Sequence, residues 1–92
     1  MLCYNEIYVI LGREPELSHD DWQTYGAYTT FDDAVKAYKN FSRDYIKVDK
    51  CIESYATSNN MNTYYLADDL TGEIIAEFRI VLAWRQKAHK LF

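Results

Sequence analysis

Residues 30–45, TFDDAVKAYKNFSRDY, decide the fold class of this chain. Large apolar residues recur in this stretch at intervals of three and four, which is the spacing of one face of an α-helix. Thr30 can cap the first turn, and the two aspartates that follow favour the positive end of the helix dipole. The sequence therefore predicts an amphipathic helix whose buried face is formed by Phe31, Ala34, Val35, Tyr38, Phe41 and Tyr45.

Strand patterns flank this helix on both sides. Before it, residues 4–11 (YNEIYVIL) are rich in β-branched and aromatic residues, and residues 24–29 (TYGAYT) can pair back on them. After it, residues 62–67 and 74–84 surround a polar turn in which Gly72 supplies the positive φ of a tight hairpin. These patterns predict an α+β fold, an antiparallel sheet of four to five strands with one main helix packed on one face.

Residues 46–57 fit two structures. Val48, Ile52 and Tyr55 continue the helical spacing, whereas Ile46, Val48 and Ile52 also alternate as they would on a strand. The sequence that follows is β-like and needs a neighbour, so we favour a strand over residues 48–57. A helix from residue 74 onward is a similar alternative, which the turn at Gly72 disfavours.

The composition describes a single globular domain over residues 1–92. Of the 92 residues, 49% are apolar and 16% aromatic, with three glycines and one proline, which excludes disordered and collagen-like chains. The longest apolar run, residues 80–84, is far shorter than the roughly 20 residues of a membrane span. The first residues lack a basic signal-peptide region, and two widely spaced cysteines suit a reducing compartment, so we expect a cytoplasmic protein.

No pattern typical of a catalytic, metal or cofactor site occurs in the sequence. Its three Asp-Asp pairs consist of adjacent residues, whose side chains point in different directions and do not converge on an ion. Neither cysteine has the spacing to a histidine that would suggest a nucleophile and its base, and no glycine-rich phosphate loop is present. We therefore predict a non-enzymatic protein that uses no cofactor.

Charge is distributed unevenly along the chain, whose net charge is −4. Residues 1–78 hold all 14 acidic residues and six basic ones, while residues 79–92 hold four basic residues and no acid. An acidic body repels nucleic acid, so direct nucleic-acid binding is disfavoured. It stays an alternative function, that of a small RNA- or DNA-binding regulator. Its aromatic residues would be Tyr4, Tyr8, Tyr64 and Tyr65, and its basic residues Arg79, Arg85, Lys87 and Lys90.

An acidic segment between residues 14 and 33 is the most informative feature for function. It contains six acids and no lysine or arginine, and it includes a tryptophan that can act as the apolar anchor of an interface. Such a surface can steer a cationic protein toward the chain. The predicted partner-binding residues are Glu14, Glu16, Asp20, Asp21, Trp22, Asp32 and Asp33. A solvated loop followed by a helix cap would explain the same acids without a partner.

The order of these segments resembles that of small phage and bacterial domains. The segments on which the resemblance rests are EIYVIL, the acidic loop, YGAYTTFDDAVKAYK and the closing hairpin TGEIIAEF. The resemblance covers residues 5–45. Size, acidity and Tyr, Asn and Asp content are similar to those of phage-encoded anti-CRISPR and anti-restriction proteins, some of which imitate DNA. The resemblance implies an inhibitor in the host cytoplasm that blocks a host defence nuclease or CRISPR-type complex through that partner's basic, nucleic-acid-binding surface. It carries over no functional residue, and the many tyrosines are equally compatible with a homodimer interface.

Overall fold

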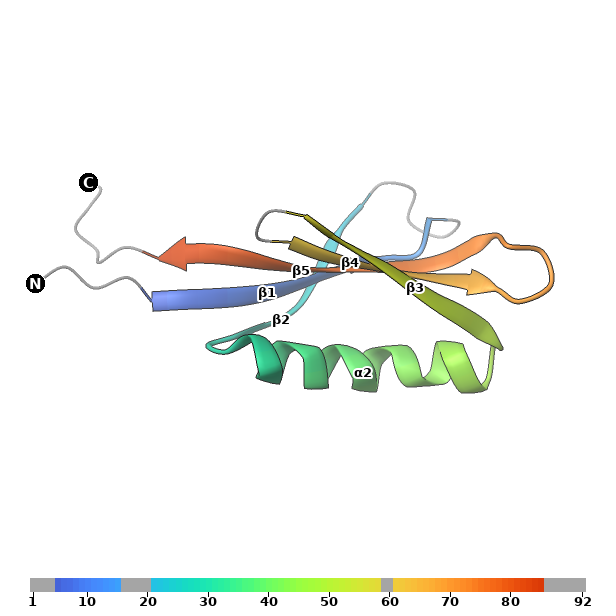
Figure 1. The fold of residues 1–92 in the computed structure, drawn as a ribbon, viewed down its shortest axis with the longest axis horizontal. Helices are drawn as coiled ribbons and strands as arrows, with labels where there is room; N and C mark the ends of the chain where they lie inside the picture. Colours follow the sequence, from blue (N-terminus) through green and yellow to red (C-terminus); the bar gives the residue numbers. More distant parts are fainter. Residues whose placement is uncertain (1–4, 16–20, 59–60, 86–92) are drawn as a thin grey trace, which may run out of the picture.

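The computed structural model of the protein describes residues 5–15, 21–58 and 61–85. A five-stranded antiparallel sheet is packed on one face by a single helix, and the sheet is open rather than closed into a barrel (Figure 1). This confirms the predicted α+β class. The strand order is β2-β1-β5-β4-β3. In chain order the elements are β1 Asn5–Arg13, β2 Gln23–Tyr28, α2 Phe31–Lys47, β3 Cys51–Ser58, β4 Met61–Asp68 and β5 Ile74–Arg85.

Helix α2 begins and ends where local chemistry requires it. Thr30 is the N-cap in an extended conformation, and its Oγ1 accepts the backbone N–H of Asp33 at 3.1 Å. At the other end the N–H of Val48 donates to the carbonyl of Asp44, and Lys50 at φ 57° redirects the chain into β3. The helix therefore ends at Lys47.

The ambiguous residues 46–57 are thus divided between the helix and a strand. The favoured strand is confirmed from Cys51 onward, and β3 runs to Ser58. The apolar residues that continue the helical spacing through this region are not buried, because Val48 is 72% exposed and Ile52 is 58% exposed. Apolar residues at the right interval form a helix face only where a surface exists to cover them.

A tight turn joins β4 and β5. Asp68 Oδ1 accepts the backbone N–H groups of Leu70 at 2.8 Å and Thr71 at 3.0 Å. These hydrogen bonds to the charged carboxylate lower the pKa of Asp68. Gly72 has φ 77° and its N–H closes the turn on the Asp68 carbonyl at 2.9 Å. The hairpin prediction is confirmed, and the alternative helix from residue 74 is not formed.

The centre of the sheet is the β1–β5 pair, whose two strands come from opposite ends of the described chain. Their register runs without a shift from Asn5 opposite Arg85 to Arg13 opposite Glu77. Strand β2 adds to β1 through a register shift between Ile10 and Leu11, and β3 forms the far edge beside β4. Residues 23–28 therefore pair with β1, as the sequence predicts, and β4 pairs with β5.

The core lies between α2 and one face of the sheet, and aromatic rings dominate it. Phe78 of β5 is at its centre and is 1% exposed. Edge-on contacts join the Phe78 ring to Tyr25 at 5.3 Å, Tyr38 at 5.6 Å and Tyr45 at 6.1 Å between ring centres. The predicted helix face is the buried one, with Ala34 and Tyr38 fully covered and its first residue, Phe31, left 37% exposed.

Candidate functional site

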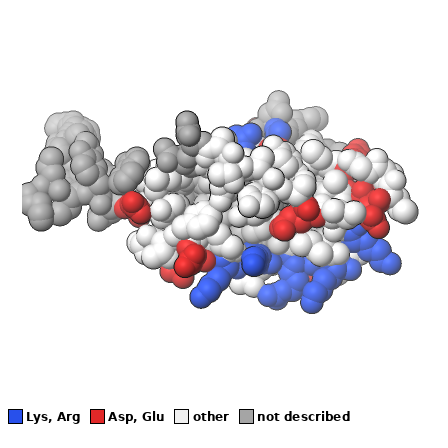
Figure 2. Space-filling view, in the orientation of Figure 1, with Lys and Arg blue, Asp and Glu red and all other residues white. Residues whose placement is uncertain are grey.

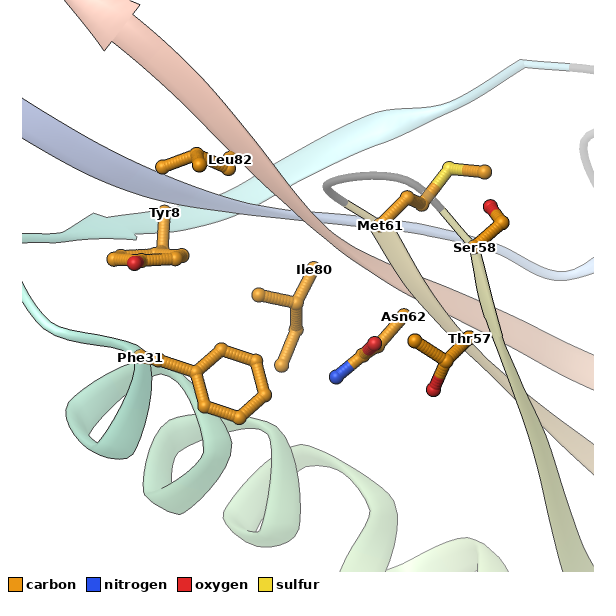
Figure 3. A pocket seen from close by; sticks show the side chains of 8 residues that line it. All are labelled: Tyr8, Phe31, Thr57, Ser58, Met61, Asn62, Ile80 and Leu82. Atoms are coloured by element: carbon orange, nitrogen blue, oxygen red, sulfur yellow. The ribbon is translucent and has the colours of Figure 1, made fainter.

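A pocket lies where the first turn of α2 meets the sheet. Phe31 projects from the helix toward Tyr8 of β1, and the two rings meet edge-on with centres 5.7 Å apart. These two side chains help to line a cavity of about 300 Å³ between the helix and the sheet (Figure 3). We call it the α2 N-terminal pocket, and its lining residues are Tyr8, Phe31, Thr57, Ser58, Met61, Asn62, Ile80 and Leu82.

Three exposed acidic residues are close in the chain to residues that line this pocket. Asp32 and Asp33 follow the pocket residue Phe31 directly, in the first turn of α2. Glu6 lies on β1, and its Oε1 accepts the Tyr8 hydroxyl at 3.0 Å. That hydrogen bond raises the pKa of Tyr8. Figure 2 shows acidic side chains at this end of the molecule. A largely apolar pocket at an acidic end of the molecule suits a ligand that carries both an apolar group and positive charge.

The other predicted partner-binding residues lie elsewhere. Glu14 accepts a hydrogen bond from the Tyr45 hydroxyl, near the C-terminal end of α2. Tyr45 is 13 positions from Asp32 along the helix, which corresponds to about 20 Å. Asp21 is exposed and precedes β2, whose six residues span about 20 Å before the chain reaches α2. The structure therefore separates these acids into three places, and Glu16 and Asp20 lie outside the described residues.

Trp22 is held in a cluster of charged residues on the sheet face that does not contact α2. Two guanidinium groups lie over its ring, with the Cζ of Arg13 at 4.7 Å and that of Arg79 at 4.2 Å from the ring centre. Glu77 is 5% exposed and connects the two arginines, at 3.0 Å from Arg13 Nη2 and 3.5 Å from Arg79 Nη2. Such cation–π and ion-pair contacts fix the segment before β2 against β1 and β5. Trp22 is therefore half-buried within the fold.

The residues of the nucleic-acid alternative do not form one platform. Tyr8 and Tyr64 face the helix side, where Tyr64 stacks on Tyr38 with ring centres 4.0 Å apart. Tyr65 is the next residue along β4 and so points to the opposite face. Arg79 is paired with Glu77. Tyr4, Lys87 and Lys90 lie outside the described residues, as does the side chain of Arg85.

A basic stripe follows the outer face of α2. Figure 2 shows lysine and arginine side chains gathered along the helix side of the molecule. Residues three and four apart share a helix face, so these basic residues form one row along α2. The stripe consists of Lys36, Lys39, Arg43 and Lys47, all of them exposed.

Metal-binding side chains do not form a cluster within the described ranges. No three His, Cys, Asp or Glu residues there lie close enough together to hold a metal ion. Cys51 is a free, buried thiol, and burial raises its pKa, which disfavours the reactive thiolate. In the part of the chain that the structure describes, no helix has both the length and the apolar character needed to cross a membrane.

Comparison of the chain with protein-family models found no match, and neither did comparisons with curated proteins or with solved structures. The site's own geometry is therefore the basis for assigning a function.

Proposed function

We propose that the chain is a non-enzymatic protein-binding domain that takes a basic and apolar segment of its partner at the α2 N-terminal pocket. The observation that carries the proposal is the partly exposed pocket residue Phe31, which the exposed residues Asp32 and Asp33 follow directly in the first turn of α2. The pocket supplies an apolar surface, on which most binding energy concentrates. The carboxylates supply the charge that selects a cationic partner.

The specific form of this proposal is the inhibitor role implied by the resemblance to phage-encoded anti-CRISPR and anti-restriction proteins. A host defence nuclease or CRISPR-type complex presents lysine- and arginine-rich surfaces to nucleic acid. An acidic chain of net charge −4 that occupies such a surface blocks the nucleic acid from it. Of the predicted acidic residues, Asp32 and Asp33 are the ones that follow a pocket residue in the same helical turn, so they are the strongest candidates for this contact.

A random-peptide selection on the immobilised full chain tests the proposal without a known partner. We expect enriched peptides to combine a large apolar residue with lysine or arginine. Binding of those peptides should weaken by about 2- to 10-fold in Asp32→Asn/Asp33→Asn, since exposed ion pairs contribute about 0.2–1 kcal/mol. Phe31→Ala should weaken it by more than about fivefold, because it removes the apolar anchor.

Matched controls separate the pocket from general charge. Asp69→Asn/Glu73→Gln removes the same charge at the β4–β5 turn, and Leu70→Ala removes an apolar side chain that is 93% exposed there. Both controls should bind the selected peptides like the parent chain. Peptides that bind the Phe31 and Asp32/Asp33 variants as tightly as the parent would refute the proposed site.

A second candidate function is nucleic-acid binding through the basic stripe of α2, because four exposed cations at helical spacing can follow a phosphate backbone. A gel-shift titration at low salt with a short duplex and a single strand tests it. Binding in the micromolar range that is lost in Lys39→Gln/Arg43→Gln would support this function. The absence of a shift at about 50 µM would exclude it, since non-specific affinities already reach about 10⁻⁴–10⁻⁶ M at physiological salt.

A further inference from the structure

Strand β3 is an exposed edge of the sheet. Among the described residues it pairs with β4 alone, and every residue from Ile52 to Ser58 is exposed. A strand at a sheet edge presents a row of backbone N–H and C=O groups that a further strand can pair with. The register of β3 with β4 runs from Cys51 to Ser58 without a bulge, so this edge is regular over its length.

Apart from one charged residue, this edge lacks the features that normally prevent strand addition. Folded proteins protect such edges with lysine, proline, bulges or very short strands. Strand β3 has eight residues, CIESYATS, with no proline and no lysine. Its one charged residue is Glu53, whose carboxylate accepts a hydrogen bond from the Tyr38 hydroxyl. The opposite edge differs, because β2 has a register shift against β1 and contains Gly26 at φ 154°.

A row of stacked tyrosines leads from the helix to this edge. Tyr38 of α2 stacks on Tyr64 of β4 with ring centres 4.0 Å apart, and Tyr64 stacks on Tyr55 of β3 at 5.5 Å. Tyr38 and Tyr64 are buried, whereas Tyr55 is 63% exposed. The row ends at the exposed Tyr55, in the middle of the edge strand. A further ring on an added strand, about 4.8 Å away, would continue the same stacking.

We propose that β3 pairs antiparallel with β3 of a second copy of this chain, with Tyr55 opposite Tyr55 on the two-fold axis. In this register Ser54 faces Ala56, Glu53 faces Thr57 and Ile52 faces Ser58 of the second copy. No like charges face each other, and the two tyrosine rows join into one. The result is a continuous sheet with both α2 helices on the same face.

The chemistry of β3 favours a second copy over a basic or an acidic partner. A strand with a single charge offers little electrostatic selection, so the exposed Asp32 and Asp33 at the start of α2 suit a cationic partner better. An isologous two-fold contact requires a self-complementary surface. The register centred on Tyr55 meets that requirement, because it places no like charges opposite each other and puts the one charged residue, Glu53, opposite the uncharged Thr57.

Sedimentation equilibrium on the purified full chain, from about 1 µM to about 1 mM, tests the proposal. We expect a monomer–dimer equilibrium in the parent. Tyr55→Lys replaces the central tyrosine pair by two facing ammonium groups, so its dissociation constant should rise at least about tenfold. Ser54→Lys/Ala56→Lys places lysines opposite each other on the other face and leaves the tyrosine row intact, so it covers the case in which Tyr55→Lys fails to fold.

Two further variants make the test specific to the edge and to the register. Leu70→Lys adds the same charge at the β4–β5 turn and should dimerise like the parent. Thr57→Lys places a lysine opposite Glu53 of the second copy and should leave the dissociation constant unchanged or lower it by up to about fivefold. A parent that stays monomeric at about 1 mM would overturn the proposal. So would equal weakening by Leu70→Lys and Tyr55→Lys, or a dimer that neither β3 variant affects.

Amide hydrogen exchange at low and high protein concentration locates the contact in the parent. Pairing at the edge should slow exchange at alternate amides of β3, those directed away from β4, as dimer forms. Concentration-dependent protection on β2 or α2 with none on β3 would place the contact elsewhere and reject this edge. The measurement uses the chain alone, so it is independent of the partner proposed for the α2 N-terminal pocket.

Discussion

Tyr38 and Tyr45 each donate a hydroxyl hydrogen bond to a carboxylate, that of Glu53 and that of Glu14 respectively. Burial, followed by the hydrogen bond and the charge of each carboxylate, raises the pKa of both hydroxyls above the usual value of 10.0. Burial also raises the pKa of Tyr64. The fold therefore favours the neutral phenol at three positions in and beside the core.

These shifts predict a loss of stability at alkaline pH. In the unfolded chain the phenols ionise near pH 10, whereas in the folded chain they hold their protons to higher pH. Their contribution to the free energy of unfolding is thus complete below about pH 10 and declines above it. Urea midpoints should be level from pH 7 to about 9 and lower at about 11. The decline should be smaller in Tyr38→Phe/Tyr45→Phe. An equal decline in both chains would assign it to other groups.

The close packing around Gly12 leads to a second prediction at a single residue. A Cβ atom at this position would lie 2.7 Å from Phe78 Cδ1 and 2.8 Å from Tyr25 Cε1. Gly12→Ala should therefore destabilise the protein by about 1–3 kcal/mol through overpacking. Thermal unfolding of the single variants and of Gly12→Ala/Phe78→Leu measures the coupling. The double variant should lose less than the two single losses together, and strict additivity would contradict the predicted clash.

At the scale of elements, the start of α2 depends on one side chain. Thr30 Oγ1 accepts the Asp33 N–H, which has no partner within the helix. Thr30→Ala should lower the free energy of unfolding by about 1 kcal/mol, while Thr30→Ser keeps the cap and should cost much less. Thr29→Ala, at the exposed neighbouring position, is the control for urea denaturation. Equal losses at positions 29 and 30 would show that the cap contributes nothing.

Strand β3 shows where element prediction from a single sequence stops. Residues 46–57 satisfy both a helical and a strand periodicity. No local signal, such as Gly72 at the β4–β5 turn, decides between the two in this stretch. The choice follows from tertiary contacts, since β3 finds β4 as its neighbour and leaves Ile52 exposed. The buried side chain of this strand is instead that of Cys51, its first residue.

At the scale of the whole molecule, the central β1–β5 pair joins the two ends of the described chain, because Asn5 lies opposite Arg85. Contacts between residues so distant in sequence close slowly, since the loop entropy must be lost first. A circular permutant that links residue 85 to residue 5 by a short turn, and opens the chain between Asp69 and Leu70, makes β5–β1 a hairpin.

This permutant should fold at least several-fold faster than the parent while keeping the same sheet, because its central contacts become local. Stopped-flow refolding measures the rate, and far-UV circular dichroism checks the fold. A permutant with the opening between residues 48 and 49 controls for the new termini and contains the same β5–β1 link. If neither permutant folds faster, formation of the central pair does not limit the rate.

Sequence alone determined the elements that have local causes. The spacing of Ala34 and Tyr38 defines the buried face of α2, Thr30 defines its start, and Gly72 defines the β4–β5 hairpin. Each of these signals acts over a few residues, so no distant contact is needed to interpret it. The α+β class followed from the same signals, because the alternating pattern of β5 requires a helix or a second sheet to cover it.

Only the tertiary structure decided which of these residues meet. Glu77 and Arg13 are 64 positions apart, and nothing local predicts that their ion pair holds Trp22 within the fold. The acids between residues 14 and 33 are close in sequence, yet a strand and a helix carry Glu14 and Asp32 to different ends of α2. The α2 N-terminal pocket and the open β3 edge arise in the same way. Both depend on which strand lies beside which, and that order is set by packing of the whole chain rather than by any segment of it.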